Sequence, residues 1–400
     1  MDRPVNDAPE PACQVCGGRE IEVFYRAQSV PVHQNLVYRS RDEAIGCDRG
    51  EISLGVCRSC GFVSNLAFDP DRLSYSGHYD NSQACSGVFS GYMEDLADEL
   101  VQRYDLHGKR LIEVGSGQGE FLRLLCRLGP NSGIGFDPAY IPGVPVAENG
   151  DPDVEFVREF YSERHVGVRA DFICARHVLE HIQHPGEVIA TIRRSIGDRT
   201  GTPLFLEVPS VAWILREVAF WDIFYEHCSY YSAGSLARLL SANAFEVVRA
   251  REAFGGQYLW LEGLAAATTT EPREMNTEVV ELAESFERRW RDRREAVMAM
   301  IEGVSVERRT CVLWGAAGKG VTLLNVLGLQ PGQVPVVVDV NPRKHGAFVP
   351  GTGQEIVPPA ALSSIAPDVV LFTNPNYRSE IASTLTQLGL EPKLVSVHGA

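Results

Sequence analysis

The sequence predicts an α/β protein in which two open, largely parallel sheets follow a small cysteine-containing module. Twice, near residues 108–125 and 310–327, an apolar strand runs into a glycine-rich turn and then into residues with helical spacing. Two close cysteine pairs precede both units. A chain of 400 residues exceeds what one hydrophobic core usually organises. We therefore expect three domains, covering residues 1–75, 76–270 and 271–400.

Composition and charge exclude several classes of partner. The chain has 37 basic and 52 acidic residues, a formal charge of -15, which would repel a nucleic-acid backbone. No stretch reaches the roughly 20 consecutive apolar residues of a membrane helix, and the first twelve residues do not resemble a secretion signal. We expect a cytoplasmic protein that binds neither nucleic acid nor membrane.

The cysteine pairs Cys13/Cys16 and Cys57/Cys60 each have a two-residue spacer followed by glycine. This spacing lets both thiolates of one turn reach the same ion, and the glycine permits a left-handed turn. Two such pairs complete a tetrahedral site with no open position, so we predict structural zinc. Redox dithiols are the alternative. His33, between the pairs, is expected to be an ordinary polar residue.

The first glycine turn follows a strand that ends in an acid, Glu113, and its glycines alternate with single residues. Glycine lets a ligand approach the backbone closely, and the following helix offers unpaired N–H groups. A second short strand ends at Asp137-Pro138, 18 residues beyond Gly119, where an acid can accept hydrogen bonds from ribose hydroxyls. A dinucleotide-dependent enzyme is the competing interpretation of such a turn.

A third strand, beginning at Asp171, runs into the polar residues Arg176, His177, Glu180 and His181, for which site and structural roles are equally open. This combination resembles the class I methyltransferase fold. The resemblance implies that S-adenosylmethionine is the cofactor. The residues expected to bind it are Glu113, Gly115, Ser116, Gly117, Gly119, Asp137, Pro138, Arg176 and His177.

An aromatic stretch at residues 220–232 surrounds several ionisable groups. Ionisable side chains packed among aromatic rings can have shifted pKa values, as proton transfer at neutral pH requires. His227 is the candidate base, and Glu226 or Asp222 could orient it or stabilise its charged form. The alternative is an aromatic core with a hydrogen-bonded histidine.

With this stretch, the whole chain resembles the three-part sugar C-methyltransferases of deoxysugar biosynthesis. In that family the segment commonly reads tyrosine-histidine-glutamate-histidine and serves proton abstraction next to a sugar ketone. Glu226 and His227 match, whereas Phe224 and Tyr225 replace the tyrosine and first histidine. The resemblance implies a nucleotide-linked keto-deoxysugar substrate and a monomer or homodimer. It gives the candidate catalytic residues His227, Glu226, Tyr225, His181 and Tyr79, the last with a plain linker as its alternative.

The last domain is expected to begin with an amphipathic helix within residues 271–303 and to continue as a second Rossmann-like sheet. Lys319, Asn341 and Asn374 follow its strands and would suit a phosphate or sugar group, unless the domain is purely structural. Three functions rival C-methylation: O-methylation of a sugar or natural product, nicotinamide-dependent oxidoreduction, and sugar binding without catalysis.

Overall fold

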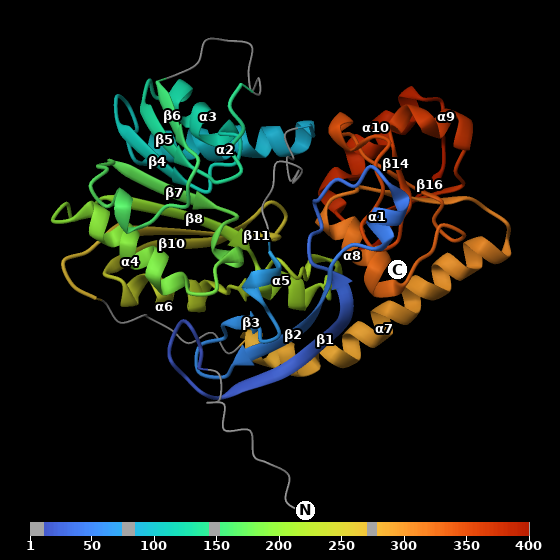
Figure 1. The fold of residues 1–400 in the computed structure, drawn as a ribbon, viewed down its shortest axis with the longest axis horizontal. Helices are drawn as coiled ribbons and strands as arrows, with labels where there is room; N and C mark the ends of the chain where they lie inside the picture. The colour runs from blue at the N-terminus through green and yellow to red at the C-terminus, as the bar shows by residue number, and fades with distance from the viewer. Residues whose placement is uncertain (1–11, 74–84, 144–152, 270–277, 400) are drawn as a thin grey trace, which may run out of the picture.

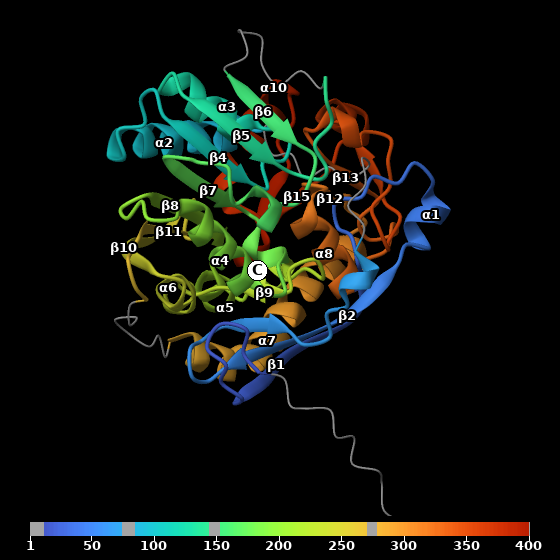
Figure 2. The ribbon, with the colours of Figure 1, turned by 60° about the vertical axis from the view of Figure 1, so that its left-hand side comes forward.

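The computed structural model describes residues 12–73, 85–143, 153–269 and 278–399, and these residues fold around three β-sheets (Figure 1). In Figures 1 and 2 the seven-stranded central sheet and the five-stranded C-terminal sheet lie beside each other, and the four-stranded N-terminal sheet lies below them. The predicted α/β class with two largely parallel sheets is confirmed.

The N-terminal sheet is antiparallel, with the order β1-β2-β3-β9. Its fourth strand comes from a distant part of the chain, because Val63 and Ser64 pair with Tyr230 and Ser229. This sheet therefore reaches the residues that follow His227 directly. Its elements are β1 (Ile21–Pro31), α1 (Arg41–Ile45), β2 (Arg49–Cys57), β3 (Val63–Asn65) and β9 (Ser229–Tyr230).

The central sheet has the order β10-β11-β8-β7-β4-β5-β6, in which β11 alone runs antiparallel to its neighbours. This is a doubly wound order, with strands added on both sides of β4. Chain order reverses between β4 and β7, and ligands of such sheets bind at the carboxyl ends of the strands there. The strands are β4 (Arg110–Val114), β5 (Ser132–Phe136), β6 (Val154–Val157), β7 (Phe172–Arg176), β8 (Pro203–Pro209), β10 (Phe245–Ala253) and β11 (Tyr258–Ala265).

Helices cover both faces of the central sheet. Successive residues of a strand point to opposite faces, so Phe172 packs with α2 and α3 while Ile173 packs with α4 and α6. Burial on both faces explains the apolar run at the start of β7 and the adjacent Leu111 and Ile112 of β4. The helices are α2 (Gly87–Arg103), α3 (Glu120–Leu128), α4 (Pro185–Ile196), α5 (Val211–Arg216) and α6 (Ala233–Ala242).

The C-terminal sheet is parallel, with the order β14-β13-β12-β15-β16, so its reversal point lies between β12 and β15. The second Rossmann-like sheet expected from the sequence is present, and Lys319, Asn341 and Asn374 follow its strands β12, β13 and β15. The elements are β12 (Cys311–Trp314), α8 (Gly318–Leu327), β13 (Val336–Val338), β14 (Glu355–Val357), α9 (Leu362–Ile365), β15 (Val369–Phe372), α10 (Arg378–Gln387) and β16 (Lys393–Ser396).

The long helix α7 (Glu278–Val306) leads into the C-terminal sheet and lies against β1 and β2 in both views (Figures 1 and 2). Its apolar face supplies Phe286, whose ring meets that of Phe24 edge-on at 5.7 Å between centroids. The predicted connecting helix is thus present, and residues 271–277 of its expected range lie outside the described residues. No helix in the described part of the chain is long and apolar enough to cross a membrane.

Candidate functional site

One cavity of about 910 Å³ runs from the first glycine turn to the second. It lies where the reversal points of the two parallel sheets face each other, so both sheets contribute the carboxyl ends of their strands. The N-terminal segment closes one side with Asn35 and Phe68. A ligand in this cavity would contact all three parts of the fold.

The first glycine turn has the backbone that only glycine adopts without strain. Gly115 and Gly117 both have positive φ, +70° and +55°, and a Cβ on Gly117 would meet no atom within 4 Å. Gly117 and Ser116 both line the cavity, whereas the hydroxyl of Ser116 is buried and has no hydrogen-bond partner among the described residues. The open space at Gly117 fits a bound nucleoside. Gly119 does not line the cavity; it is the N-cap residue of α3, with φ +89°.

The two carboxylates predicted to bind the cofactor, Asp137 and Glu113, both lie close to this turn. Asp137 accepts hydrogen bonds from the N–H groups of Gly117 and Ala139, both at 2.8 Å, and burial raises its pKa. Each of its oxygens keeps a lone pair that can accept a ribose hydroxyl. Glu113 is 3% exposed and accepts from the N–H of Leu122, and burial raises its pKa to about 8. Pro138 lines the cavity beside Asp137.

Arg176 and His177 line the cavity but are held by a carboxylate that the sequence analysis missed, Glu207 at the end of β8. Arg176 lies 2.7 Å and His177 2.9 Å from Oε1 of Glu207. Burial by itself would lower the pKa of His177, but Glu180 and Glu207 outweigh it and raise the pKa to about 9. His177 is therefore a cation at neutral pH, facing the cavity beside Tyr258.

Three of the predicted catalytic residues come together in the cavity: His181, Glu226 and His227. The two imidazole rings are 4.8 Å apart and nearly perpendicular. His227 is 6% exposed, and its Nδ1 atom has no hydrogen-bond partner in the described ranges. Burial, together with His181, His177 and Lys319, lowers the pKa of His227 well below 6.5. The ring is therefore neutral at physiological pH and can accept a proton.

The carboxylates expected to orient His227 have other partners. Asp222 forms an ion pair with Lys319, and the carboxylate of Glu226 lies 3.0 Å from Nδ1 of His33. Glu180 also lines the cavity, with Oε1 3.3 Å from His177 and a buried Oε2 without a hydrogen-bond partner among the described residues. A carboxylate oxygen of Glu180 and one nitrogen each of His181 and His227 lie within 4.8 Å of one another. Glu180 is thus the buried carboxylate grouped with the two imidazoles.

Two predicted catalytic residues do not contribute to this group. The structure contradicts the predicted catalytic role of Tyr225, because this residue does not line the cavity. Its hydroxyl forms hydrogen bonds with the backbone of Asp69, and its ring packs on Gly50 and Phe68. Neighbouring side chains in this turn point in different directions, and Phe224 is the one that faces the cavity and packs on Gly318. Tyr79 lies outside the described residues.

The C-terminal sheet presents two lysines to the cavity. Lys319 bonds Asp222 at 2.7 Å and Gln257 at 2.6 Å, and Gln257 in turn donates to Asn374. Lys344, which the sequence analysis missed, is 4% exposed and donates to the carbonyl of Ala316. No acidic group of the described chain forms an ion pair with it. Asn341 and Asn374 line the same end of the cavity.

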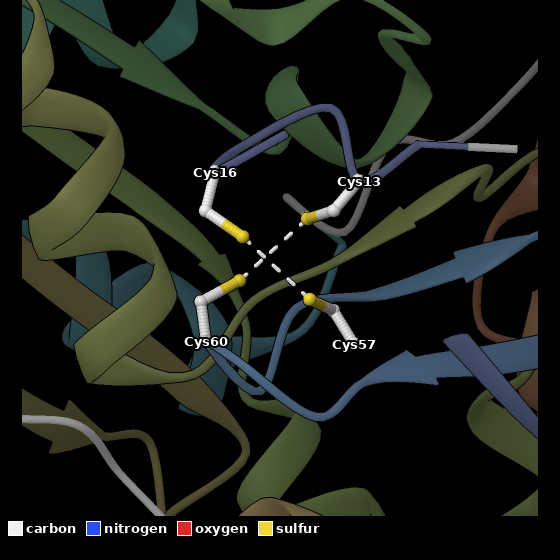
Figure 3. A group of neighbouring side chains, drawn as sticks. All are labelled: Cys13, Cys16, Cys57 and Cys60. Carbon is white, nitrogen blue, oxygen red and sulfur yellow. Dashed lines mark hydrogen bonds between the residues drawn. The ribbon is translucent and has the colours of Figure 1, made fainter. Parts of the chain in front are cut away.

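The four paired cysteines converge outside the cavity (Figure 3). Sγ of Cys13 lies 3.6 Å from that of Cys60, Cys16 and Cys57 are equally close, and all four sulfurs lie within 4.8 Å of one another. Tetrahedral zinc with bonds of about 2.3 Å separates its sulfur ligands by about 3.8 Å. The donor set and its spacing therefore fit zinc.

Most of the chain matches known protein families. Residues 89–250 match the family described as a methyltransferase domain, and residues 262–391 match the family described as the C-methyltransferase C-terminal domain. The C-methyltransferase NovU of Streptomyces niveus is 29% identical over 398 residues, which cover 95% of this chain and 92% of that protein.

Solved structures similar to this chain include two methyltransferases. Magnesium protoporphyrin IX methyltransferase of Synechocystis PCC 6803, with bound SAH, is 15% identical with a TM-score of 0.36, over 45% of this chain and 84% of that one. The 1,6-didemethyltoxoflavin-N1-methyltransferase of Burkholderia thailandensis is 16% identical with a TM-score of 0.35, over 45% and 81%.

Proposed function

We propose that this chain, an S-adenosylmethionine-dependent methyltransferase, methylates a carbon atom next to the ketone of a nucleotide-linked deoxysugar. The two matched domains and the similarity to NovU support a C-methyltransferase family. The finer assignment depends on His227, a buried and neutral imidazole in the same cavity as the first glycine turn. Its Nδ1 atom has no hydrogen-bond partner in the part of the chain that the structure describes. The unprotonated imidazole is the form that can accept a proton from carbon.

The residues around the first glycine turn would hold the cofactor. Asp137 would accept the ribose hydroxyls, Gly117 leaves room for the nucleoside, and Glu113 would face the cationic end of the molecule. When bound, S-adenosylmethionine supplies an electrophilic methyl group on a sulfonium. The protein's main contribution is then to position the acceptor and exclude water.

His227 would take the proton from the substrate carbon, and the electron pair of that C–H bond would remain on the substrate as an enolate. The buried carboxylate of Glu180 would stabilise the imidazolium formed at this moment. Both ring nitrogens of His177 lie next to carboxylates, those of Glu180 and Glu207, so His177 would hold Glu180 in place beside the two imidazoles. The electron pair of the enolate would form the new C–C bond to the methyl group while the methyl–sulfur bond breaks, its electron pair staying on sulfur as a neutral thioether. The proton taken from the substrate would remain on His227.

The C-terminal end of the cavity would bind the anionic nucleotide part of the substrate. Lys344 supports this, because a buried ammonium without an ion-pair partner among the described residues is costly unless an anion compensates it. Lys319 lies at the first turn of α8, where backbone N–H groups also favour a phosphate. We also propose that Cys13, Cys16, Cys57 and Cys60 hold a structural zinc ion.

The test is incubation with ¹³C-methyl-labelled cofactor and a panel of nucleotide-linked 4-keto-deoxysugars, followed by NMR of the product. C-methylation gives a signal at the chemical shift of a methyl group on carbon, whereas O-methylation gives a methoxyl signal and would overturn the proposal. A nucleotide sugar without a ketone is the matched control and should acquire no label. Absence of label from every keto sugar, in enzyme that binds the cofactor, would reject this substrate class.

A further inference from the structure

His33 is buried against the active site although it belongs to the N-terminal segment. Its Nδ1 atom lies 3.0 Å from Oε1 of Glu226, and 193 positions separate the two residues. The exposed fractions are only 8% for His33 and 1% for Glu226. Because a carboxylate can only accept, the imidazole donates this hydrogen bond. His33 does not line the cavity, whereas Glu226 does, so His33 reaches the cavity through one intervening residue.

Glu226 connects His33 to both imidazoles of the site. Its backbone carbonyl accepts a hydrogen bond from Nδ1 of His181 at 3.1 Å, and His227 is its direct neighbour in the chain. A rotation of the Glu226 side chain or peptide would therefore move the partner of one imidazole and the backbone of the other. The direction in which His181 and His227 point depends on how firmly Glu226 is held.

The N-terminal segment also holds this stretch by its backbone. Asn65 donates its N–H to the carbonyl of Cys228 at 3.0 Å, and β3 pairs with β9 immediately afterwards. The residues just after His227 are thus fixed by sheet hydrogen bonds, and the side chain just before it is fixed by His33. Hydrogen bonds are stronger in a buried, low-dielectric setting, and a buried carboxylate that loses its partner is costly.

From these contacts we infer that His33 is a positioning residue of the active site, which fixes Glu226 so that His181 and His227 keep their productive orientation. This inference rests on the proposed function. It makes the cysteine-containing N-terminal segment a part of the catalytic apparatus. Without the donor at position 33, the Glu226 carboxylate would turn toward other donors in the cavity, including the two imidazoles.

The first experiment compares three variants of the full-length enzyme in methyl transfer to the keto sugar. His33→Leu removes the donor. His33→Asn keeps an N–H at the same number of bonds from Cα as Nδ1. Gln34→Leu is the matched control, because Gln34 is also buried in the same loop and its side chain donates to the carbonyl of Pro31, with no other hydrogen bond to the described residues. If His33→Leu does not fold, His33→Gln, whose amide lies one bond further out, takes its place.

We expect His33→Leu to lower kcat by about 10- to 100-fold, as small misplacements of reacting groups do. The KM for S-adenosylmethionine should stay within twofold, and His33→Asn should recover most of the loss. Wild-type kcat in His33→Leu, or an equal loss in Gln34→Leu, would overturn the inference, because His33 would then serve folding alone.

A second readout separates this inference from the proposed function. In ¹⁵N-histidine-labelled enzyme with bound S-adenosylhomocysteine, the imidazole resonances of His181 and His227 are assigned with His181→Gln and His227→Gln. They should shift in His33→Leu and return in His33→Asn, whatever the substrate is. Unchanged resonances would overturn the positioning role, whereas shifted resonances without turnover of any keto sugar would reject the proposed substrate and leave the positioning role supported.

Discussion

The ammonium nitrogen of Lys319 lies 2.7 Å from Oδ2 of Asp222, and this ion pair joins the second glycine turn to the loop that precedes His227. Both side chains line the cavity. Burial raises the pKa of Asp222, and the charge of Lys319 opposes that shift. The pair fixes the relative position of two elements between which the substrate would lie.

Replacing Lys319 by methionine should weaken binding of an anionic substrate. The substitution removes a positive charge from the cavity and leaves Asp222 buried without its cation, so the KM for the nucleotide sugar should rise by about 10- to 100-fold. Steady-state kinetics against each substrate in turn would measure this, with the KM for S-adenosylmethionine unchanged. In the double variant Lys319→Met/Asp222→Asn the thermal midpoint should recover while the KM stays high. A recovered KM would mean that Lys319 only neutralises Asp222.

Replacing His227 by glutamine should abolish most of the methyl transfer. Loss of a general base typically costs about 10²- to 10⁴-fold in rate. The cofactor dissociation constant, measured by calorimetry, should be unchanged because His227 lies beyond the first glycine turn. His107→Gln, an exposed histidine outside the cavity, is the control and should keep wild-type kcat. If His227→Gln lowered kcat by less than threefold, the base would have to be another group.

The acid limb of the pH profile of kcat, where the rate falls as the pH is lowered, should lie below pH 6.5. Burial, with the nearby His181, His177 and Lys319, lowers the pKa of His227 from its ordinary value of 6.5. The reactive form is the unprotonated ring, so kcat should stay level as the pH falls through 6.5 and should decline only in more acidic solution. His181→Gln removes one of these neighbouring groups and should move the limb toward higher pH. A limb at or above pH 6.5 in the wild-type enzyme would contradict this description of His227.

Much of the fold, and the cofactor end of the site, can be predicted from short stretches of sequence. Glu113, Gly115 and Gly117 belong to one strand and one turn, so apolar periodicity and glycine spacing place them without any knowledge of distant contacts. The same holds for the four cysteines, because each pair shares a turn. Asp137 required one further step, namely that parallel strands end at the same edge of a sheet.

The substrate end of the cavity depends on contacts between residues far apart in the sequence, which short sequence patterns do not predict. Glu226 was expected to orient His227, but its carboxylate pairs with His33, 193 positions away. Asp222 pairs with Lys319 for a similar reason. Tyr225 shows a different limit, because side chains in an irregular turn do not alternate predictably. In the sequence, Lys344 is only a basic residue two positions after Pro342. Its burial, which the sequence does not show, is what marks it as a candidate binding residue.

Replacing Glu113 by glutamine should stabilise the free protein and weaken cofactor binding. Burial raises the pKa of Glu113 to about 8, above that of an exposed glutamate, so ionisation of this group costs stability as the pH rises from about 4.3 to 8. At pH 8 the apo variant should therefore unfold at a higher temperature than the wild type, with little difference at pH 4.5. Calorimetry should show about 10-fold weaker binding of S-adenosylmethionine. A variant less stable at pH 8 with unaltered affinity would contradict this role.

Removing the metal from the four cysteines should disturb the catalytic end of the cavity, because Cys57 ends β2, Cys60 follows in the same turn, and β3 pairs with the strand after His227. We expect one zinc per chain by elemental analysis, and a much lower zinc content with a reduced thermal midpoint in Cys57→Ser. Cys85→Ser, an exposed cysteine outside the cluster, should keep the full zinc content. In the metal-free protein, amide exchange should accelerate in residues 57–65 and 228–231 before it does so in α3. Exchange that rises only near residues 13–16, or a wild-type protein without zinc, would show that the cluster does not support this strand.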